Sequence, residues 1–131
     1  MKSTNYTVVF EPFTERHFVK TFAKKFKGAW DITSLIIKKE FEQIDLLFLR
    51  RVAEIIVGSG DVKICKTEFK IAGTKESMHS SGNRCIVAIH TATNEVRVLL
   101  IYAKTDLGGD NETANWKRMV RDNYPEYKCL V

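Results

Sequence analysis

The stretch between Asp61 and Thr105 has the hydrophobic pattern of β-strands. Three extended segments are predicted there, at residues 62–71, 83–91 and 96–105. In the first, Cys65 and Phe69 fall on one face and Lys66 and Glu68 on the other, because successive side chains of a strand point to opposite sides. The second and third segments are apolar at both alternating positions, which is typical of interior strands. The stretch therefore predicts the centre of a β-sheet that has one charged face.

The chain ahead of this sheet begins with a short strand and a first helix. Residues 6–10 are β-branched and aromatic, so they predict a strand. Phe18, Phe22 and Phe26 then recur at four-residue intervals and mark the buried side of a helix. Thr14 is the predicted N-cap of this helix.

A second, longer helix is expected from Asp31 or Thr33 to about Val57, because its apolar residues recur at intervals of three and four. Those residues are Ile37, Phe41, Ile44, Phe48, Val52 and Ile55. Gly58 and Gly60 should end it. Both helices need an apolar partner, and the sheet is the available one. We therefore expect the two helices to cover one face of the sheet and to leave the charged face open.

A third helix is predicted over residues 111–123, with Trp116 and Val120 on its buried side. The element order is then β-α-α-β-β-β-α. This order predicts one α+β domain over residues 1–131. Its sheet is antiparallel-rich with about four strands, two N-terminal helices pack on one face, and a helix follows at the C-terminus.

Composition narrows the class of protein. The 131 residues carry a formal net charge of +5, which suggests an acidic partner. No apolar run is long enough to span a membrane, and the N-terminus lacks the apolar core of a secretory signal. Cys65, Cys85 and Cys129 have no metal-like spacing, and we expect the first two to be buried thiols. A cytoplasmic protein without a metal or other cofactor is the expectation.

Cations gather in the central stretch: residues 62–84 hold five Lys or Arg against two Glu. Polyanion binding on the charged face of the sheet is the prediction. The candidate catalytic residues are Arg84, Lys66, Lys104, Tyr102 and His79. The candidate phosphate-binding residues are Lys63, Lys70, Lys75, Ser80 and Ser81.

The register of the last hairpin decides whether this site exists. A loop of two or four residues within residues 92–95 would place Arg84 opposite Ala103 and turn Lys104 to the other face. A three-residue loop with a bulge would place Arg84 opposite Lys104, with Tyr102 on the same side. The sequence leaves both registers open.

The segment GNRCIVAIHTATNEVRVLLIYAKTDL, residues 82–107, resembles the central hairpin of the RelE/ParE toxin superfamily, especially its RelE- and HigB-like members. The shared features are a G-x-R strand, a turn, and a strand that ends in an aromatic-x-Lys motif, here Tyr102-Ala103-Lys104. The resemblance implies a RelE-like fold and an mRNA interferase: an endoribonuclease that needs no metal, cuts mRNA on the ribosome, and is silenced by an antitoxin protein.

Such an enzyme would let the 2′-hydroxyl of the RNA attack the adjacent phosphate. Arg84 would stabilise charge on the phosphorane, since its planar fork matches two phosphate oxygens. A lysine would act as base and His79 or Tyr102 as acid. Three alternatives stay open: Arg84 pairs with Glu68 across strands, the chain is a ParE-like toxin that binds a replication enzyme, or it is a non-catalytic nucleic-acid-binding module.

Overall fold

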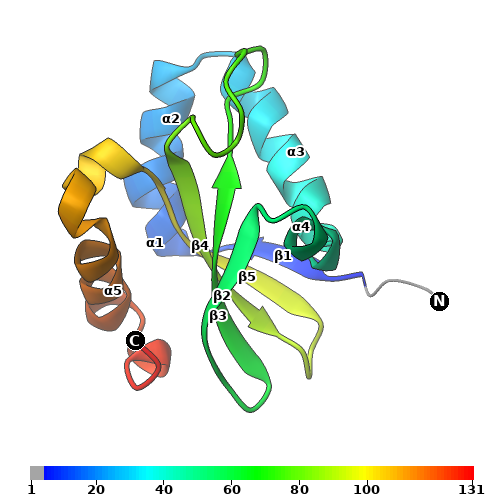
Figure 1. Ribbon diagram of the computed structural model, residues 1–131, viewed down its shortest axis with the longest axis vertical. Coiled ribbons are helices and arrows are strands. Elements are labelled where there is room, and N and C mark those ends of the chain that lie inside the picture. Colours follow the sequence, from blue (N-terminus) through cyan, green and yellow to red (C-terminus); the bar gives the residue numbers. More distant parts are fainter. Residues whose placement is uncertain (1–4) are drawn as a thin grey trace.

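A five-stranded sheet forms the middle of the molecule (Figure 1). The computed structural model describes residues 5–131. The strands are β1 Thr7–Phe10, β2 Ala53–Ser59, β3 Val62–Phe69, β4 Asn83–His90 and β5 Glu95–Ala103. They lie in the order β1-β5-β4-β3-β2. The pair β1–β5 is parallel and the other three pairs are antiparallel.

Helical segments lie on both sides of this sheet. Before β2 come α1 Pro12–Thr14, the π-helical segment η1 Glu15–Val19, α2 Lys20–Lys25, α3 Ala29–Glu42 and α4 Asp45–Leu49. After β5 come the 3₁₀ turns η2 Lys104–Leu107 and η3 Gly109–Asn111, then α5 Glu112–Asn123 and the 3₁₀ turn η4 Pro125–Tyr127. No helix within residues 5–131 is both long and apolar enough to cross a membrane.

The first helix begins earlier than predicted. It starts at Pro12, which suits a first helical position because its missing N–H needs no partner there. Thr14 lies inside the helical segment and does not cap it, so that prediction is wrong. Its hydroxyl instead donates to the carbonyl oxygens of Val98, at 3.1 Å, and Leu99. The threonine therefore fixes the helix to β5.

The helix predicted to reach Val57 is also wrong, because α3 ends at Glu42 and residues 53–59 form β2. Three consecutive β-branched residues, Ile55 to Val57, favour a strand. Gly60, with φ of +58°, closes the tight turn from β2 to β3. The sheet thus has five strands where about four were predicted.

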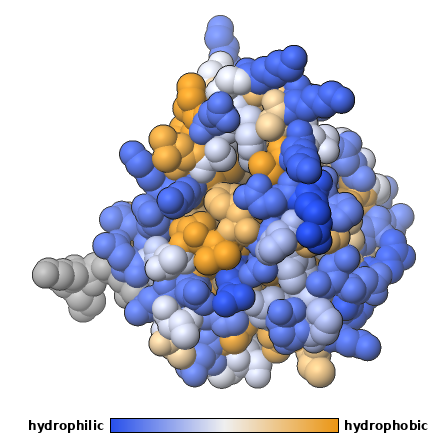
Figure 2. All heavy atoms as spheres, turned by 180° about the vertical axis from the view of Figure 1, so that it is seen from behind, coloured by the Kyte–Doolittle hydropathy of each residue, from blue (hydrophilic) through white to orange (hydrophobic). Residues whose placement is uncertain are grey.

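The face of the sheet toward α2 and α3 carries the larger core. Phe22 of α2 and Trp30, Ile37 and Phe41 of α3 are buried against Cys65, Cys85 and Val87 of the strands. The predicted alternation in β3 is confirmed here, since Cys65 and Phe69 belong to this core. On this side of the molecule some apolar side chains also reach the surface among hydrophilic ones (Figure 2). Those of α3 are Ile32, Leu35 and Ile36.

The opposite face is not left open, contrary to the prediction. Trp116 and Val120 of α5, with Tyr124 and Tyr127 after it, are buried against this face. The strand residues of this second core are Ile64, Ile86, Ala88, Leu99, Leu100 and Tyr102. The predicted bounds of α5 are confirmed to within one residue. The side chains of this second core come from only part of each strand. Charged residues occupy the rest of this face.

A bulge in β5 sets the register of the last hairpin. His90 pairs with Glu95 across a four-residue loop, and Leu99 is the extra residue between two pairs of the ladder. Arg84 consequently lies opposite Tyr102, so neither predicted register is correct. Without the bulge, Arg84 would face Ile101. The bulge therefore turns the Tyr102 side chain to the same face as Arg84.

Candidate functional site

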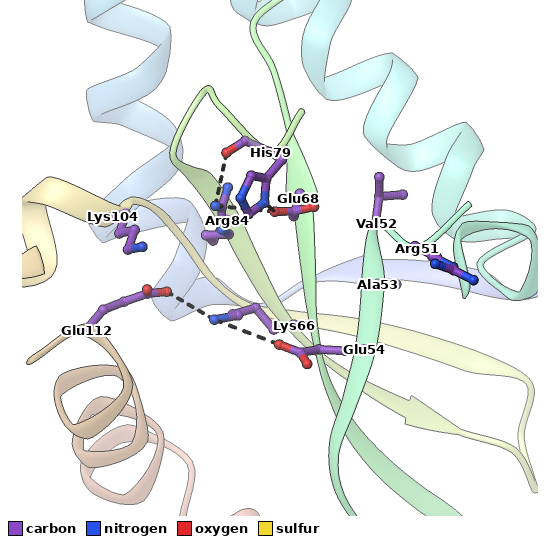
Figure 3. A pocket seen from close by; sticks show the side chains of 10 residues that line it. All are labelled: Arg51, Val52, Ala53, Glu54, Lys66, Glu68, His79, Arg84, Lys104 and Glu112. Carbon is purple, nitrogen blue, oxygen red and sulfur yellow. Dashed lines mark hydrogen bonds and ion pairs between the residues drawn. The ribbon is translucent and has the colours of Figure 1, made fainter. Parts of the chain in front are cut away.

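A cleft of about 290 Å³ opens on the α5 side of the sheet, where the second core ends (Figure 3). Strands β2, β3 and β4, the turn before β2, the loop before β4, the first residue of η2 and the first residue of α5 contribute to it. Its lining residues are Arg51, Val52, Ala53, Glu54, Lys66, Glu68, His79, Arg84, Lys104 and Glu112. Four of these are Lys or Arg and three are Glu, so the cleft has a small positive excess with the histidine neutral.

Arg84 forms the floor of the cleft and is almost completely buried, with 4% of its surface exposed. The strand register places it opposite Glu68, and its Nη2 lies 3.3 Å from Glu68 Oε2. Its guanidinium also donates two hydrogen bonds to backbone carbonyl oxygens, from Nη1 to Asn83 at 2.9 Å and from Nη2 to His79 at 3.1 Å. The alternative that Arg84 pairs with Glu68 across strands is confirmed. A buried guanidinium needs such partners, since an unpaired buried charge is costly.

Lys66 is the second cation on the floor. Its Nζ lies 3.6 Å from Glu112 Oε2 of α5 and 4.0 Å from Glu54 Oε1 of β2. Glu112 Oε2 also accepts a hydrogen bond of 2.6 Å from the Tyr102 hydroxyl. These contacts tie the first turn of α5 to β3 and β5, and they hold the ammonium of Lys66 in place.

Tyr102 is directed into the fold. It is buried, and its hydroxyl donates to Glu112. Burial, and next the hydrogen bond to Glu112, raise the pKa of the Tyr102 phenol. The phenol therefore stays protonated at neutral pH. Its placement makes it an orienting group for Glu112, with the hydroxyl committed to that carboxylate.

His79 stands at the mouth of the cleft, and its side chain is 83% exposed. Its Nδ1 lies 2.5 Å from Glu68 Oε2. The loop that carries it is fixed by serine hydroxyls: Ser80 bonds Ser77 in both directions, and Ser81 Oγ contacts the carbonyl of Phe69 and accepts the amide of Asn83. The hydroxyls of Ser80 and Ser81, predicted to bind phosphate, thus bond to Ser77 of the loop and to the strand ends on either side of it.

Lys104 is the most available of the predicted cations in the cleft. It begins η2 just after β5 and is exposed. Within residues 5–131 no carboxylate lies within 4.0 Å of its ammonium. Arg84 and Lys104 therefore line the same cleft, away from α2 and α3, as the predicted site requires (Figure 3).

The other predicted phosphate-binding lysines lie outside the cleft lining. Lys63 is near the start of β3, and strand alternation turns it to the opposite face from Lys66. Lys70 follows β3, and Lys75 lies in the loop between β3 and β4. All three are exposed. The local charge excess in the sequence therefore does not coincide with the cleft.

Three charged residues of the cleft were missed by the sequence pattern: Arg51, Glu54 and Glu112. The first two were hidden by the helix predicted over them, and the β-branched run that follows was the available signal for a strand. Arg51 adopts a left-handed conformation, φ 60°, at the turn into β2. Glu112 was missed because α5 was not expected to touch the charged face.

Two further groups bear on the chemistry of the site. Cys65 and Cys85 are buried free thiols, as predicted, and burial raises the pKa of Cys65 to about 12. Among residues 5–131, no group of three or more His, Cys, Asp and Glu side chains is placed to hold a metal ion.

A comparison with solved structures finds a protein of similar fold. The chain superimposes on the archaeal RelE–RelB complex from Pyrococcus horikoshii OT3 with a TM-score of 0.55 and 13% sequence identity. The match covers 77% of this chain and 97% of that chain. The fold is RelE-like. No family model and no curated protein matches the sequence. At this identity the RelE-like fold is what the comparison establishes, and the cleft chemistry has to be argued from the residues of this chain.

Proposed function

We propose that this RelE-like protein is a metal-independent endoribonuclease toxin that cleaves mRNA on the ribosome and is neutralised by an antitoxin protein. One observation carries the proposal. Lys66, His79, Arg84 and Lys104 come from four different segments and line one cleft on the face of the sheet away from α2 and α3. Cations and an imidazole in one cleft are the groups that metal-free cleavage of RNA requires.

Each of these side chains has a distinct part in the proposed reaction. The 2′-hydroxyl attacks the adjacent phosphorus, and the 5′-oxygen leaves. Lys104, whose ammonium has no carboxylate within 4.0 Å among residues 5–131, would hold a phosphate oxygen, and Lys66 adds positive charge from the floor. Arg84 contributes its charge from a fixed, buried position. His79 is exposed and positioned for proton transfer.

A protein partner is supported by two separate observations. The similar structure was solved as a complex of RelE with RelB. In this chain, a hollow of about 470 Å³ lies between the first helical segments and α3, and its lining combines apolar residues such as Phe10, Val19 and Leu35 with charged ones such as Glu15 and Asp31. Exposed Leu35 and its neighbours on α3 would be covered by such a partner.

Lys104→Ala tests the proposal without disturbing the fold, because the side chain is exposed and has no ion pair within residues 5–131. We expect cleavage of mRNA on intact ribosomes to fall about 10²-fold, since a lost charge-stabilising group costs on the order of 10²–10³. Lys63→Ala is the matched control: it removes the same charge from an exposed site on β3 outside the cleft. Equal cleavage by the two variants would contradict the proposal.

A second candidate function is a non-catalytic nucleic-acid-binding module. The observation that favours it is the pairing of Arg84, whose guanidinium already contacts Glu68 and two carbonyls. Binding by such a module would weaken steeply with salt as phosphate contacts release counterions, and RNA would remain intact. Pulse labelling after induction separates the endoribonuclease and the binding module from a ParE-like toxin. Early loss of protein synthesis indicates mRNA cleavage, and early loss of DNA synthesis indicates a replication target. Loss of neither indicates a harmless binding module.

A further inference from the structure

Three side chains form a line of contacts from the floor of the cleft to its mouth: Arg84, Glu68 and His79 (Figure 3). One oxygen, Glu68 Oε2, contacts both Arg84 Nη2 at 3.3 Å and His79 Nδ1 at 2.5 Å. The exposed fraction of the side chain rises along the line, from 5% for Arg84 through 15% for Glu68 to 83% for His79. The inner end is therefore fixed by the fold, and the outer end is accessible to a large substrate.

The short contact to Glu68 defines the proton on the imidazole. A carboxylate can only accept, so His79 Nδ1 is the donor in this hydrogen bond. In the neutral ring the second nitrogen, Nε2, then carries a lone pair and no proton. Among the described residues 5–131 Nδ1 is the ring nitrogen with a hydrogen-bond partner, so Nε2 is the atom that can meet a substrate. A neutral imidazole in this tautomer is arranged to accept a proton.

The backbone around His79 is held as well as its ring. Arg84 Nη2 donates to the His79 carbonyl at 3.1 Å, so the same guanidinium contacts both Glu68 and the chain that carries the histidine. Ser77 and Ser80 bond each other on either side of it. Preorganised groups of this kind lose little entropy when a substrate arrives.

We propose that Glu68 is a positioning residue that makes His79 the general base of the cleft; this inference rests on the proposed ribonuclease function. His79 Nε2 takes the proton of the 2′-hydroxyl, the 2′-oxygen bonds to phosphorus, and the bond from phosphorus to the 5′-oxygen breaks. Water supplies a proton to the leaving 5′-oxygen, and the imidazolium returns its proton to solvent. Arg84 serves this step by holding Glu68.

The other charged side chains around the cleft differ from Glu68 in their positions relative to the His79 ring. Arg50 reaches the sulfur of Met78, the residue before His79. The remaining charged residues of the cleft are Arg51, Glu54, Lys66, Lys104 and Glu112. Within residues 5–131, Glu68 is the carboxylate within 4.0 Å of the His79 ring. Glu68 is therefore the carboxylate that can orient the His79 ring.

The first test is the pH dependence of cleavage by the full-length protein, using wild type, His79→Ala and Glu68→Gln. The wild-type rate should fall on acidification, because a protonated general base cannot accept the proton of the 2′-hydroxyl. His79→Ala should lose this acidic limb and at least 10²-fold of kcat. Glu68→Gln should keep the limb but lose about 10-fold in kcat with KM unchanged. An acidic limb that persists in His79→Ala, or a Glu68→Gln enzyme as fast as wild type, would overturn the inference.

The second test needs no catalysis and does not depend on the folding of Glu68→Gln. Nitrogen-15 NMR of the His79 ring in the RNA-free wild-type protein should show the Nδ1–H tautomer. An Nε2–H tautomer would overturn the inference even if RNA is cleaved. A wild-type protein that binds but never cleaves RNA would remove both the proposed function and this inference. Cleavage that His79→Ala leaves intact would remove only the inference.

Discussion

The two faces of one sheet differ in how completely they are covered. On the side of α2 and α3, the strands present Cys65, Cys85 and Val87 to a continuous apolar core. On the side of α5, the same strands present apolar residues along one part and charged residues along the rest. Alternation in β3 and β4 supplies both sets. The cleft lies where the covering helix begins, so the extent of α5, more than the density of lysines, locates the candidate site.

The largest effect is expected from breaking the core on each face. Trp116→Ala, on α5, and Phe41→Ala, on α3, remove large buried side chains, and each should lower the free energy of unfolding by about 3–5 kcal/mol. Urea unfolding measures both. The comparison sharpens when cleavage is assayed under conditions where both variants remain folded. Only Trp116→Ala should lose activity, because α5 positions Glu112 beside Lys66. Equal losses of activity would mean that the faces are not functionally distinct.

A smaller effect is expected from opening the ion pair on the floor of the cleft. Arg84→Ala leaves Glu68 without its guanidinium in a largely buried position, so unfolding should become easier by about 3 kcal/mol. Lys104→Ala, at an exposed position in the same cleft, should change stability by less than about 0.5 kcal/mol. An Arg84→Ala protein as stable as wild type would show that the guanidinium does not support the fold.

The sequence predicted the parts of this comparison that depend on local periodicity. The alternation of Cys65 with Lys66 assigned their faces correctly, and the spacing of Trp116 and Val120 identified the buried side of α5. The helix predicted through Ile55 was wrong, although its apolar residues recur at intervals of three and four. That spacing also occurs where a chain leaves a helix, makes a turn packed on the core and enters a strand. The bulge at Leu99 has no local signal: it depends on pairing between β4 and β5, and it alone decides that Tyr102 faces Arg84.

The stability of the protein at alkaline pH should depend on the buried phenol of Tyr102. Its pKa is raised in the folded protein above the unfolded value of about 10, so its contribution to stability is complete below pH 10 and is lost as pH rises above it. We expect wild type to lose up to about 1.4 kcal/mol per pH unit from this group above pH 10. Tyr102→Phe should show a correspondingly shallower decline in urea unfolding at pH 9 to 11. An unchanged slope would contradict the burial of this hydroxyl.

The smallest effect should come from thiol modification. Cys129 is exposed, whereas Cys65 and Cys85 are buried, with the pKa of each raised by burial. One thiol should react with a thiol reagent in the folded protein and three after denaturation. Modification at Cys129 should leave stability and cleavage unchanged. Rapid reaction of a second thiol in the native protein would show that the core beneath α2 and α3 is open.

The central claim is that the cleft directs the 2′-hydroxyl of RNA against its neighbouring phosphate, and a single substitution in the substrate tests it most directly. The measurement is cleavage on ribosomes of an mRNA and of the same mRNA carrying a 2′-deoxy nucleotide at the mapped cleavage site. We predict that the first yields a 2′,3′-cyclic phosphate and a 5′-hydroxyl, and that the second remains intact at that site. Cleavage of the 2′-deoxy substrate at the same position and rate would contradict the account.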